Sequence, residues 1–267
     1  MSTDTAPHVL VEKLGHVVVV TMNRPEKRNA FGLEMLARLA DAWAMIDGDD
    51  EVRVAILTGA GGHFCAGSDL KEMAGPRPDN EWSKRFAADR DLHWKGMLRH
   101  HRLKKPLIAA IEGTAIAGGT EIVQATDIRV AGATAKFGIS EAKWALFPLG
   151  GSTVRLRRQI PYAHAIDILL TGRHFMADEA LRIGLISRVV PDGGALAEAK
   201  AIAETIAGNG PLAVQAIKRS VMECEGLPEA EALKKELEIG WPILATEDAK
   251  EGPRAFAEKR KPVFKGR

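Results

Sequence analysis

Two glutamates are the residues of this sequence best placed to do chemistry. Glu121 ends the segment 108–121, in which an apolar run leads to Gly118 and Gly119, and Glu141 ends a second, shorter segment. Small residues at the start of a helix can present backbone N–H groups to an oxyanion, because those N–H groups lack a partner within the helix. Two carboxyl groups beside such a place can give and take protons, so the sequence predicts an enzyme.

A second N–H donor is expected from Ser68, which follows Ala66 and Gly67 in a similar small-residue segment. Glu141 precedes an apolar run that begins at Trp144, and a carboxyl group against apolar walls has its pKa raised and can act as an acid. Taken singly, each feature favours a structural role over a catalytic one. A glycine pair allows close packing, a serine caps a helix, and a glutamate forms a loop ion pair.

Other chemistries lack their motifs. The segment 59–64 has no final glycine for a dinucleotide fingerprint, which counts against an oxidoreductase of the generic α/β type. Neither a phosphate loop nor a nucleophile elbow is present, and the 8 histidines show no metal-binding spacing, so no metal is expected. With 1 tyrosine and 5% aromatic residues, stacking platforms for RNA are scarce.

Composition favours a globular protein that acts on a small molecule. The chain has 267 residues, 46% of them hydrophobic and 27% charged, with a net charge of +2 that gives no general field for nucleic acid or membranes. Cys65 and Cys224 are too few for a disulfide framework and indicate a cytoplasmic protein. Residues 1–7 carry no signal or transit peptide pattern, and no apolar run is long enough to cross a membrane.

Hydrophobic periodicity and turn residues predict an α/β fold with a mostly helical carboxyl-terminal part. We expect strands at 17–22, 54–58, 106–111, 128–131, 136–138 and 187–190, and helices at 33–44, from 68–69 onward, at 82–102 and at 118–124. A catalytic region of residues 1–191 is then followed by a region of residues 192–267, with helices at 195–207, 211–224 and 228–237. The apolar positions of this second region predict oligomer contacts, although packing against its own core would also account for them.

Taken together, these segments resemble the enoyl-CoA hydratase/isomerase (crotonase) family over nearly the whole chain. The segments that carry the resemblance are 23–30, 64–71, 111–121, 126–127, 137–138, 170–172, 180–185 and 256–260. The resemblance implies a spiral of ββα repeats with a helical trimerisation region, assembled as a trimer or a dimer of trimers. It also implies an acyl-CoA thioester as substrate, with coenzyme A as part of that substrate and no separate cofactor.

The resemblance also assigns residues. It implies that the N–H groups of Ser68 and Gly118 form an oxyanion hole and that Glu121 and Glu141 are the catalytic pair of a hydratase. We expect Glu121 to act on water and Glu141 on the α-proton, although a close pair titrates together. The residues implied to line coenzyme A are Arg28, Ala30, Ala66, Asp69, Leu70 and Lys71, with Phe256 and Lys259 reaching a neighbouring subunit's site.

Two departures from the family pattern are visible. Ala117 stands where many members have the first of three glycines. The sequence from Ser140 to Trp144 also differs from the common hydratase sequence. Trp144 is expected in the acyl pocket, and the acyl preference stays open. The sequence of this segment is closer to a branch of the family that includes hydratases of steroid side-chain thioesters. Two glutamates favour a hydratase of fatty-acid or steroid side-chain β-oxidation, while an isomerase or a hydroxyacyl-CoA dehydratase of the same family remains open.

Overall fold

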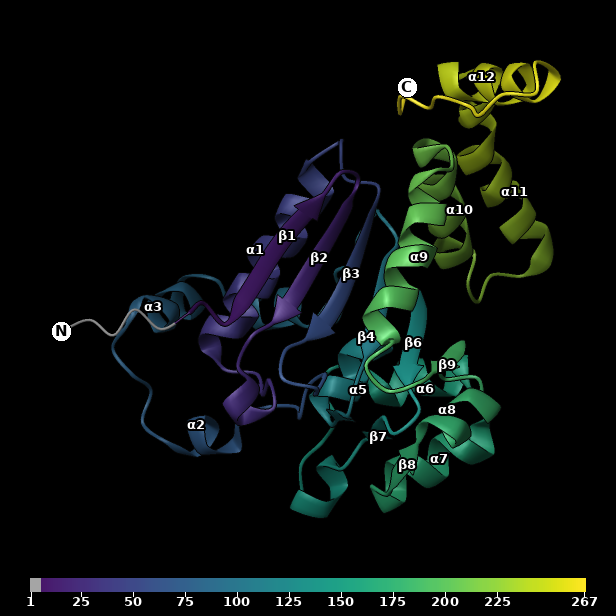
Figure 1. The fold of residues 1–267 in the computed structure, drawn as a ribbon. Helices are drawn as coiled ribbons and strands as arrows, with labels where there is room; N and C mark the ends of the chain where they lie inside the picture. Colours follow the sequence, from purple (N-terminus) through teal and green to yellow (C-terminus); the bar gives the residue numbers. More distant parts are fainter. Residues whose placement is uncertain (1–5) are drawn as a thin grey trace.

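The computed structural model describes residues 6–267 (Figure 1). Residues 1–5, which belong to the stretch without a signal or transit peptide pattern, lie outside the described residues. The helices are α1 (Leu33–Gly48), α2 (Leu70–Ala74), α3 (Glu81–Ala88), α4 (Leu92–Gly96), α5 (Gly118–Val123), α6 (Ser152–Gln159), α7 (Tyr162–Thr171), α8 (Ala177–Arg182), α9 (Ala195–Ala207), α10 (Pro211–Glu223), α11 (Glu229–Gly240) and α12 (Glu247–Ala257), with the short 3₁₀ helices η1 (Pro25–Lys27), η2 (Glu141–Trp144) and η3 (Trp241–Ala245).

The strands of residues 6–267 form two sheets. They are β1 (Val9–Leu14), β2 (Val17–Met22), β3 (Val54–Gly59), β4 (Leu107–Ile111), β5 (Thr114–Ile116), β6 (Ile128–Gly132), β7 (Lys136–Gly138), β8 (His174–Met176) and β9 (Arg188–Val190). The larger sheet has the order β1-β2-β3-β4-β6-β9 and is parallel except for the β1–β2 pair. The smaller sheet, β5-β7-β8, pairs β5 with β7 in parallel and β7 with β8 antiparallel.

The larger sheet is buried on both faces, as its unbroken apolar strands predict. Alternate residues of β2 point to opposite sides: Val18 and Val20 belong to a core shared with α1, whereas Val17 and Val19 belong to a core shared with α9. Helix α1 therefore covers one face and α9 covers the other (Figure 1). The predicted strands are confirmed within one or two residues at each end, and the sequence analysis missed β1 and β8.

The single helix predicted for residues 82–102 is wrong. The chain instead forms α3 and α4 with a turn between them, where the Asp89 carboxylate accepts a hydrogen bond of 2.9 Å from the Asp91 N–H. After α4, Leu98 has a φ of 51°, which ends the helical path. The indole of Trp43 in α1 donates a hydrogen bond of 3.0 Å to the Gly96 carbonyl, so tertiary contacts place α4 against α1.

The helices predicted after residue 192 are confirmed as α9, α10 and α11 within a few residues, and η3 and α12 follow them. Helix α9 packs on the sheet, while α10, α11 and α12 project away from it (Figure 1). The division of the chain at residue 191, and the use of residues 192–267 in assembly, stay predictions. No helix among residues 6–267 has the length and apolar content needed to span a membrane.

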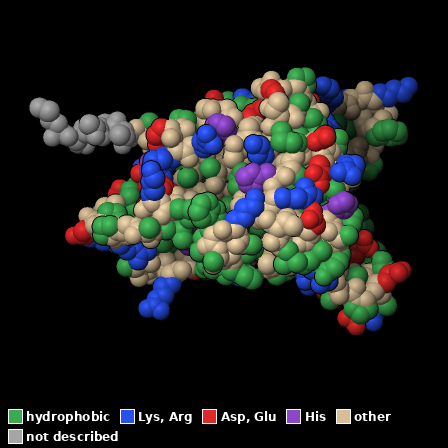
Figure 2. Space-filling model, turned by 90° about the horizontal axis from the view of Figure 1, so that it is seen from below, with side chains coloured by type: hydrophobic (Ala, Val, Ile, Leu, Met, Phe, Trp, Pro, Cys, Tyr) green, Lys and Arg blue, Asp and Glu red, His purple; other side chains and the backbone are tan. Residues whose placement is uncertain are grey.

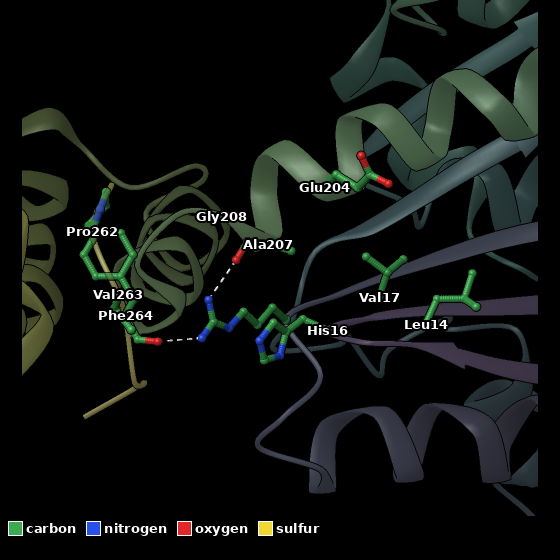
Figure 3. A pocket seen from close by; sticks show the side chains of 10 residues that line it. Leu14, His16, Val17, Glu204, Ala207, Gly208, Pro262, Val263 and Phe264 are labelled. Carbon is green, nitrogen blue, oxygen red and sulfur yellow. Dashed lines mark hydrogen bonds between the residues drawn. The ribbon is translucent and has the colours of Figure 1, made fainter. Parts of the chain in front are cut away.

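The carboxyl-terminal tail returns to the sheet beside a cavity of about 450 Å³ (Figure 3). Arg53 connects the end of α9 to the carboxyl-terminal tail. Its guanidinium donates to the Ala207 carbonyl at 2.8 Å and to the Phe264 carbonyl at 2.7 Å. Both acceptors are backbone groups, and His16 and Glu204 lie on the same wall. This cavity therefore marks the joint between the tail and the sheet.

Candidate active site

The predicted oxyanion hole depends on two segments that cross closely. Cys65 forms an isolated β-bridge with Ala115, and Ser68 forms one with Phe31. These backbone pairings fix the path of the chain from residue 65 to residue 68. Gly67 has a φ of 89°, and a Cβ built on it would lie 2.9 Å from the Ala117 Cβ. Glycine is therefore required at position 67, because any side chain there would push the two segments apart.

Ser68 and Gly118 both line the same cavity. Gly67 directly precedes Ser68, and a Cβ built on Gly67 would lie 3.2 Å from the Gly118 nitrogen. The segments that carry the two N–H donors are therefore neighbours. Neither N–H donates a hydrogen bond to any of the residues from 6 to 267. Such a pair of available donors can hold an oxygen that gains negative charge.

Ala117, the departure from the family pattern, adopts a backbone conformation that favours glycine. Its φ is 52° and its ψ is −123°, a region in which an alanine costs about 1–3 kcal/mol. The hydrogen bond of 2.7 Å from the Ala117 N–H to the Gly138 carbonyl helps to hold the residue there. The chain thus accepts strain at this position and still places the Gly118 N–H in the cavity.

Glu121 is buried in the first turn of α5, with 5% of its surface exposed. Its Oε1 accepts a hydrogen bond of 3.3 Å from the backbone N–H of Ser152, the first residue of α6. Burial raises the pKa of Glu121, while hydrogen bonds from Ser152 and Gly150 act in the opposite direction. Glu121 is therefore a buried carboxyl group whose charged form is partly supported by its neighbours.

Glu141 has a different environment. It is the first residue of η2, and its Oε2 is buried without a hydrogen-bond partner among residues 6–267. Burial first, and then the charge of Glu121, raise the pKa of Glu141 to about 7. This carboxyl group therefore keeps its proton to near-neutral pH and can donate it.

The cavity that joins these groups has a volume of about 650 Å³. Among the predicted residues, it is lined by Ala66, Ser68, Asp69, Leu70, Gly118, Glu121, Glu141 and Trp144. Its mouth is apolar, because Trp144 is 68% exposed and both Phe147 and Met73 are 63% exposed. On the face seen from below, hydrophobic side chains lie between Lys, Arg and His side chains (Figure 2).

Five predicted residues do not line this cavity: Arg28, Ala30, Lys71, Phe256 and Lys259. Arg28 is connected to the site through its backbone, since its carbonyl accepts a hydrogen bond of 3.0 Å from the Ala66 N–H. Phe256 is 87% exposed and belongs to α12, at the opposite end of the molecule from α2 (Figure 1). The coenzyme-lining roles of all five stay predictions.

Asp69 lines the cavity, yet its carboxylate is occupied by structural contacts. Its Oδ1 accepts from the N–H groups of Lys71 and Glu72, which caps α2, and Oδ2 lies 3.1 Å from Arg24. These contacts confirm that Asp69 opens the helix expected from residue 68 or 69. They also connect α2 to the loop that carries Arg24.

Several wall residues were missed by the sequence analysis, namely His93, Trp94, Met97, Leu149 and Gly150. The first three belong to or follow α4, in the stretch where the sequence analysis expected one helix over residues 82–102. Ser152 was missed as well. Its signal was available in the sequence, because a serine after Gly150 and Gly151 and before an arginine-rich stretch is typical of a helix start.

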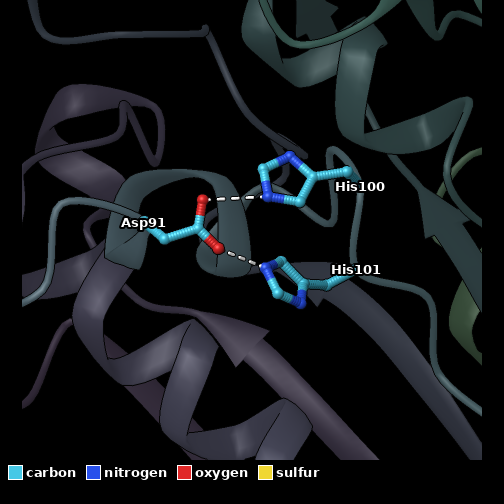
Figure 4. Close-up of side chains that lie close together, drawn as sticks. All are labelled: Asp91, His100 and His101. Carbon is cyan, nitrogen blue, oxygen red and sulfur yellow. Dashed lines mark hydrogen bonds and ion pairs between the residues drawn. The ribbon is translucent and has the colours of Figure 1, made fainter.

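A cluster outside the cavity also escaped the sequence analysis. Asp91 lies before α4 and His100 and His101 lie after it, and their rings approach the carboxylate at 2.9 Å and 2.5 Å (Figure 4). Side chains of these types can ligate a metal, and their ligand atoms lie within 4.8 Å of one another. Both carboxylate oxygens are already paired with ring nitrogens, so the cluster joins the two ends of the segment that carries α4.

Comparisons with known proteins agree with this geometry. The family model described as enoyl-CoA hydratase/isomerase matches residues 12–267. The sequence is 55% identical over 266 residues to the enoyl-CoA hydratase EchA19 of Mycobacterium tuberculosis, covering 100% of this chain and 99% of that relative. It is 41% identical over 260 residues to (E)-benzylidenesuccinyl-CoA hydratase of Thauera aromatica, with 97% and 99% covered.

Solved structures show the same fold. The crystal structure of enoyl-CoA hydratase EchA1 from Mycobacterium marinum matches with a TM-score of 0.89 and 42% sequence identity, and the match covers 98% of this chain and 100% of that one. A putative enoyl-CoA hydratase/isomerase from Mycobacterium abscessus matches with a TM-score of 0.89 and 43% identity, covering 97% and 100%. The predicted fold class is thereby confirmed.

Proposed function

This chain belongs to the enoyl-CoA hydratase/isomerase family, and we propose how its cavity performs the reaction of an enoyl-CoA hydratase. The enzyme is a hydro-lyase that adds water across the 2,3 double bond of an enoyl-CoA thioester to give a 3-hydroxyacyl-CoA. Coenzyme A is part of the substrate, and no separate cofactor takes part in the proposed reaction.

In the proposed first step the thioester carbonyl accepts hydrogen bonds from the N–H groups of Ser68 and Gly118. Water then attacks C3, the electrons of the double bond move toward the carbonyl, and an enolate oxygen forms between the two donors. Each such donor typically lowers the barrier by about 3–4 kcal/mol, because it binds the transition state better than the substrate. The close crossing at Gly67 supports this role, since it brings the two N–H groups together.

The two carboxyl groups have complementary roles in this proposal. Glu121 takes the proton from the attacking water, and Glu141 gives its proton to C2 of the enolate. One proton then returns from Glu121 to Glu141 before the next turnover. The observation that carries the proposal is the contrast between the two environments: hydrogen-bond donors support the charge of Glu121, whereas Glu141 is buried, lacks a partner at Oε2 and has a pKa of about 7.

The apolar mouth of the cavity supports an acyl group larger than crotonyl. Trp144, Phe147 and Met73 expose apolar surface there, and burying apolar surface contributes roughly 25 cal/mol per Å² to binding. We propose fatty-acyl or steroid side-chain thioesters of β-oxidation as substrates. The relative from Thauera aromatica is described as an (E)-benzylidenesuccinyl-CoA hydratase, and the benzylidene group in that name is bulkier than the crotonyl group.

The remaining parts of the proposal concern assembly and location. Phe256 and Lys259 lie on or after α12, and a neighbouring subunit of a trimer or of a dimer of trimers would bring them to a coenzyme A site. Phe256 is 87% exposed in the single chain, which supports a buried position in the assembly. The unpaired cysteines Cys65 and Cys224 support a cytoplasmic location.

The test is turnover of a panel of enoyl-CoA thioesters from crotonyl to steroid-sized, followed by loss of the conjugated enoyl absorbance. A hydratase incorporates the oxygen of ¹⁸O-labelled water at C3, whereas an isomerase moves the double bond without incorporating it. A dehydratase catalyses the same equilibrium from the hydroxyacyl side, so both directions are assayed. Absence of ¹⁸O from the product across the whole panel would reject the proposal.

A further inference from the structure

We propose that Ser152 is a positioning residue that holds Glu121 as a carboxylate, and that Gln124 sets the direction of the Ser152 hydroxyl. The inference deepens the proposed function and rests on it, because it explains which of the two glutamates takes the proton from water. Ser152 and Gln124 lie at the start of α6 and just after α5, respectively, and neither lines the cavity.

The orientation of the Gln124 amide is fixed by its neighbours. Its Nε2 lies 3.2 Å from the backbone carbonyl of Thr120, which can only accept a hydrogen bond, so the amide nitrogen and not the oxygen must face that carbonyl. The same Nε2 lies 2.8 Å from the Ser152 Oγ. Gln124 is 1% exposed and Ser152 is 0% exposed, so water does not compete for this contact.

This contact directs the serine proton. Because Ser152 Oγ accepts from Gln124, its own O–H is available for another acceptor. In this proposal the O–H is directed to the neighbouring Glu121 carboxyl group, whose pKa the Ser152 side chain lowers. The backbone N–H of Ser152 donates to Glu121 Oε1 at 3.3 Å. One residue therefore offers Glu121 two donors, and both favour the charged carboxylate.

The Ser152 side chain is not needed for its own helix. The residue before it, Gly151, occupies the N-cap position of α6, and no side-chain cap is found there. A serine at a helix start usually turns its oxygen toward the next N–H groups. Here the oxygen instead accepts from Gln124, while the backbone N–H of the same residue donates to Glu121, which is a reason for serine at this position beyond helix formation.

The other charged groups near Glu121 do not replace this contact. Arg155, one turn further along α6, gives its Nη2 to the Leu98 and Arg99 carbonyls, so its charge acts on Glu121 only through space. Glu141 approaches from η2 with like charge, and His93 lines the cavity from α4. From α2 and the turn before it, Glu72 and Asp69 add two more carboxylates to the cavity wall.

A pH profile of kcat/KM tests the role of the hydroxyl. Ser152→Ala is expected to move the acidic limb upward by about one pH unit, because a hydrogen bond to a charged group is lost, and to leave KM for the thioester within about twofold. Ser152→Thr restores the hydroxyl and is expected to return the limb toward the wild-type position. An acidic limb that stays in place in Ser152→Ala would overturn the proposal.

The matched control is Thr126→Ala. Thr126 is buried, and its hydroxyl donates to the Val123 carbonyl at 2.7 Å without touching the cavity. This variant loses a buried hydroxyl from the same region and is expected to lower stability while leaving the pH profile in place. A limb that moves equally in both variants would show that general loosening, and not the Ser152 hydroxyl, shifts the profile.

A double-mutant cycle tests whether Gln124 acts through Ser152. Gln124→Met keeps the length of the side chain and removes its donors, so a smaller upward shift of the acidic limb is expected. In the Ser152→Ala background the same change is expected to add nothing, because the hydroxyl that Gln124 orients is already gone. Additive shifts would reject this part of the proposal.

Titration of Glu121 itself separates the positioning role from catalysis. In the Glu141→Gln background only one member of the pair titrates, and ¹³C-labelled glutamate reports its protonation by NMR. Adding Ser152→Ala is expected to raise the midpoint for Glu121 by about one unit. If the wild-type enzyme hydrates no thioester but this midpoint still shifts, the proposed function fails and the positioning role stands. If the midpoint does not shift, the positioning role is wrong, whatever the activity.

Discussion

Gly150 lies directly against the carboxyl group of Glu121. A Cβ built on Gly150 would be 2.4 Å from Glu121 Oε2 and 2.9 Å from the Glu121 Cβ, both far inside van der Waals contact. The loop that follows η2 can therefore cover the Glu121 carboxyl group only because position 150 carries no side chain. Glu121 is buried by this approach, and its hydrogen bond from Ser152 depends on the same stretch of chain.

Gly150→Ala is accordingly expected to displace the Glu121 carboxyl group and to reduce kcat by at least about 100-fold, because a general base must lie within hydrogen-bond reach of its proton. Steady-state hydration of an enoyl-CoA thioester measures this loss. The control is Gly48→Ala, since Gly48 ends α1 and nothing lies within 4 Å of an added Cβ. Near-normal kcat in folded Gly150→Ala would contradict the placement of Glu121.

Glu121→Gln and Glu141→Gln are each expected to reduce hydration by at least about 100-fold, because general acid–base groups contribute roughly 10²–10⁴. The residual pH profiles should differ. Glu121 acts charged, so wild-type kcat/KM falls as pH drops through its pKa; Glu141 acts protonated, so kcat/KM also falls as pH rises above about 7. Glu121→Gln should lose the acidic limb and Glu141→Gln the basic limb. A retained limb would reassign the roles.

Glu141 also predicts a pH-dependent stability. Its pKa is raised from 4.5 to about 7 in the folded state, by burial first and by the charge of Glu121 second, so folding disfavours its ionised form. The resulting destabilisation begins near pH 4.5, grows until about pH 7 and is complete above that. Glu141→Gln should therefore raise the free energy of unfolding at pH 8 by about 2–3 kcal/mol and leave it unchanged at pH 4.

Urea unfolding at the two pH values measures the difference. Exposed Glu236→Gln is the matched control, and we expect no change in its stability at either pH. Equal stabilisation by Glu141→Gln at pH 4 and pH 8 would mean that packing, and not charge, accounts for the effect.

Two substitutions at Gly118 separate the N–H from the space around it. Gly118→Pro removes the donor and is expected to abolish hydration. Gly118→Ala keeps it: the φ of Gly118 is not positive, and an added Cβ would lie 3.3 Å from the Phe31 ring, so partial activity should remain. Circular dichroism checks that both variants fold. Hydration by a folded Gly118→Pro enzyme would show that this N–H does not hold the enolate.

The basic stretch 259–261 near the carboxyl terminus predicts a salt-dependent affinity for coenzyme A thioesters. Lys259→Ala should raise KM several-fold at low salt, with the difference shrinking as ionic strength rises, because a lysine paired with phosphate acts as a screened point charge. Lys250→Ala removes an exposed lysine from α12 itself and should have no such effect. Truncation before residue 240 should weaken binding further, through loss of Phe256. An unchanged KM in Lys259→Ala would remove this residue from the site.

The sequence predicted the parts of the fold that local pattern determines. The run of β-branched residues at 17–22 became β2 without a change of boundary, and Gly118 does begin α5. These features depend on residues that lie next to one another in the chain. Glu121 and Glu141 line one cavity, Glu121 from the first turn of α5 and Glu141 from the start of η2, and the sequence analysis named both.

What the sequence did not predict depends on contacts between distant segments. The packing of α4 against α1 is stabilised by the hydrogen bond from Trp43 to Gly96, 53 positions apart. The contact between Gly150 and Glu121 depends on where η2 directs the chain. Ser152 has an ordinary helix-start signal, and only its position beside Gln124 and Glu121 reveals a second use.

The two-sided burial of the large sheet has a consequence for synthesis on the ribosome. The strands that form this face are β2, β3, β4 and β6, all made before α9, yet the apolar side chains of Val17, Val19 and Ile56 are covered only when α9 arrives. A nascent chain that has emerged only as far as β9 presents an uncovered apolar sheet face, which is a target for chaperones and for aggregation. Completion of the core therefore requires residues 195–207. Helices α10 to α12 emerge later, when α9 already covers this face of the sheet.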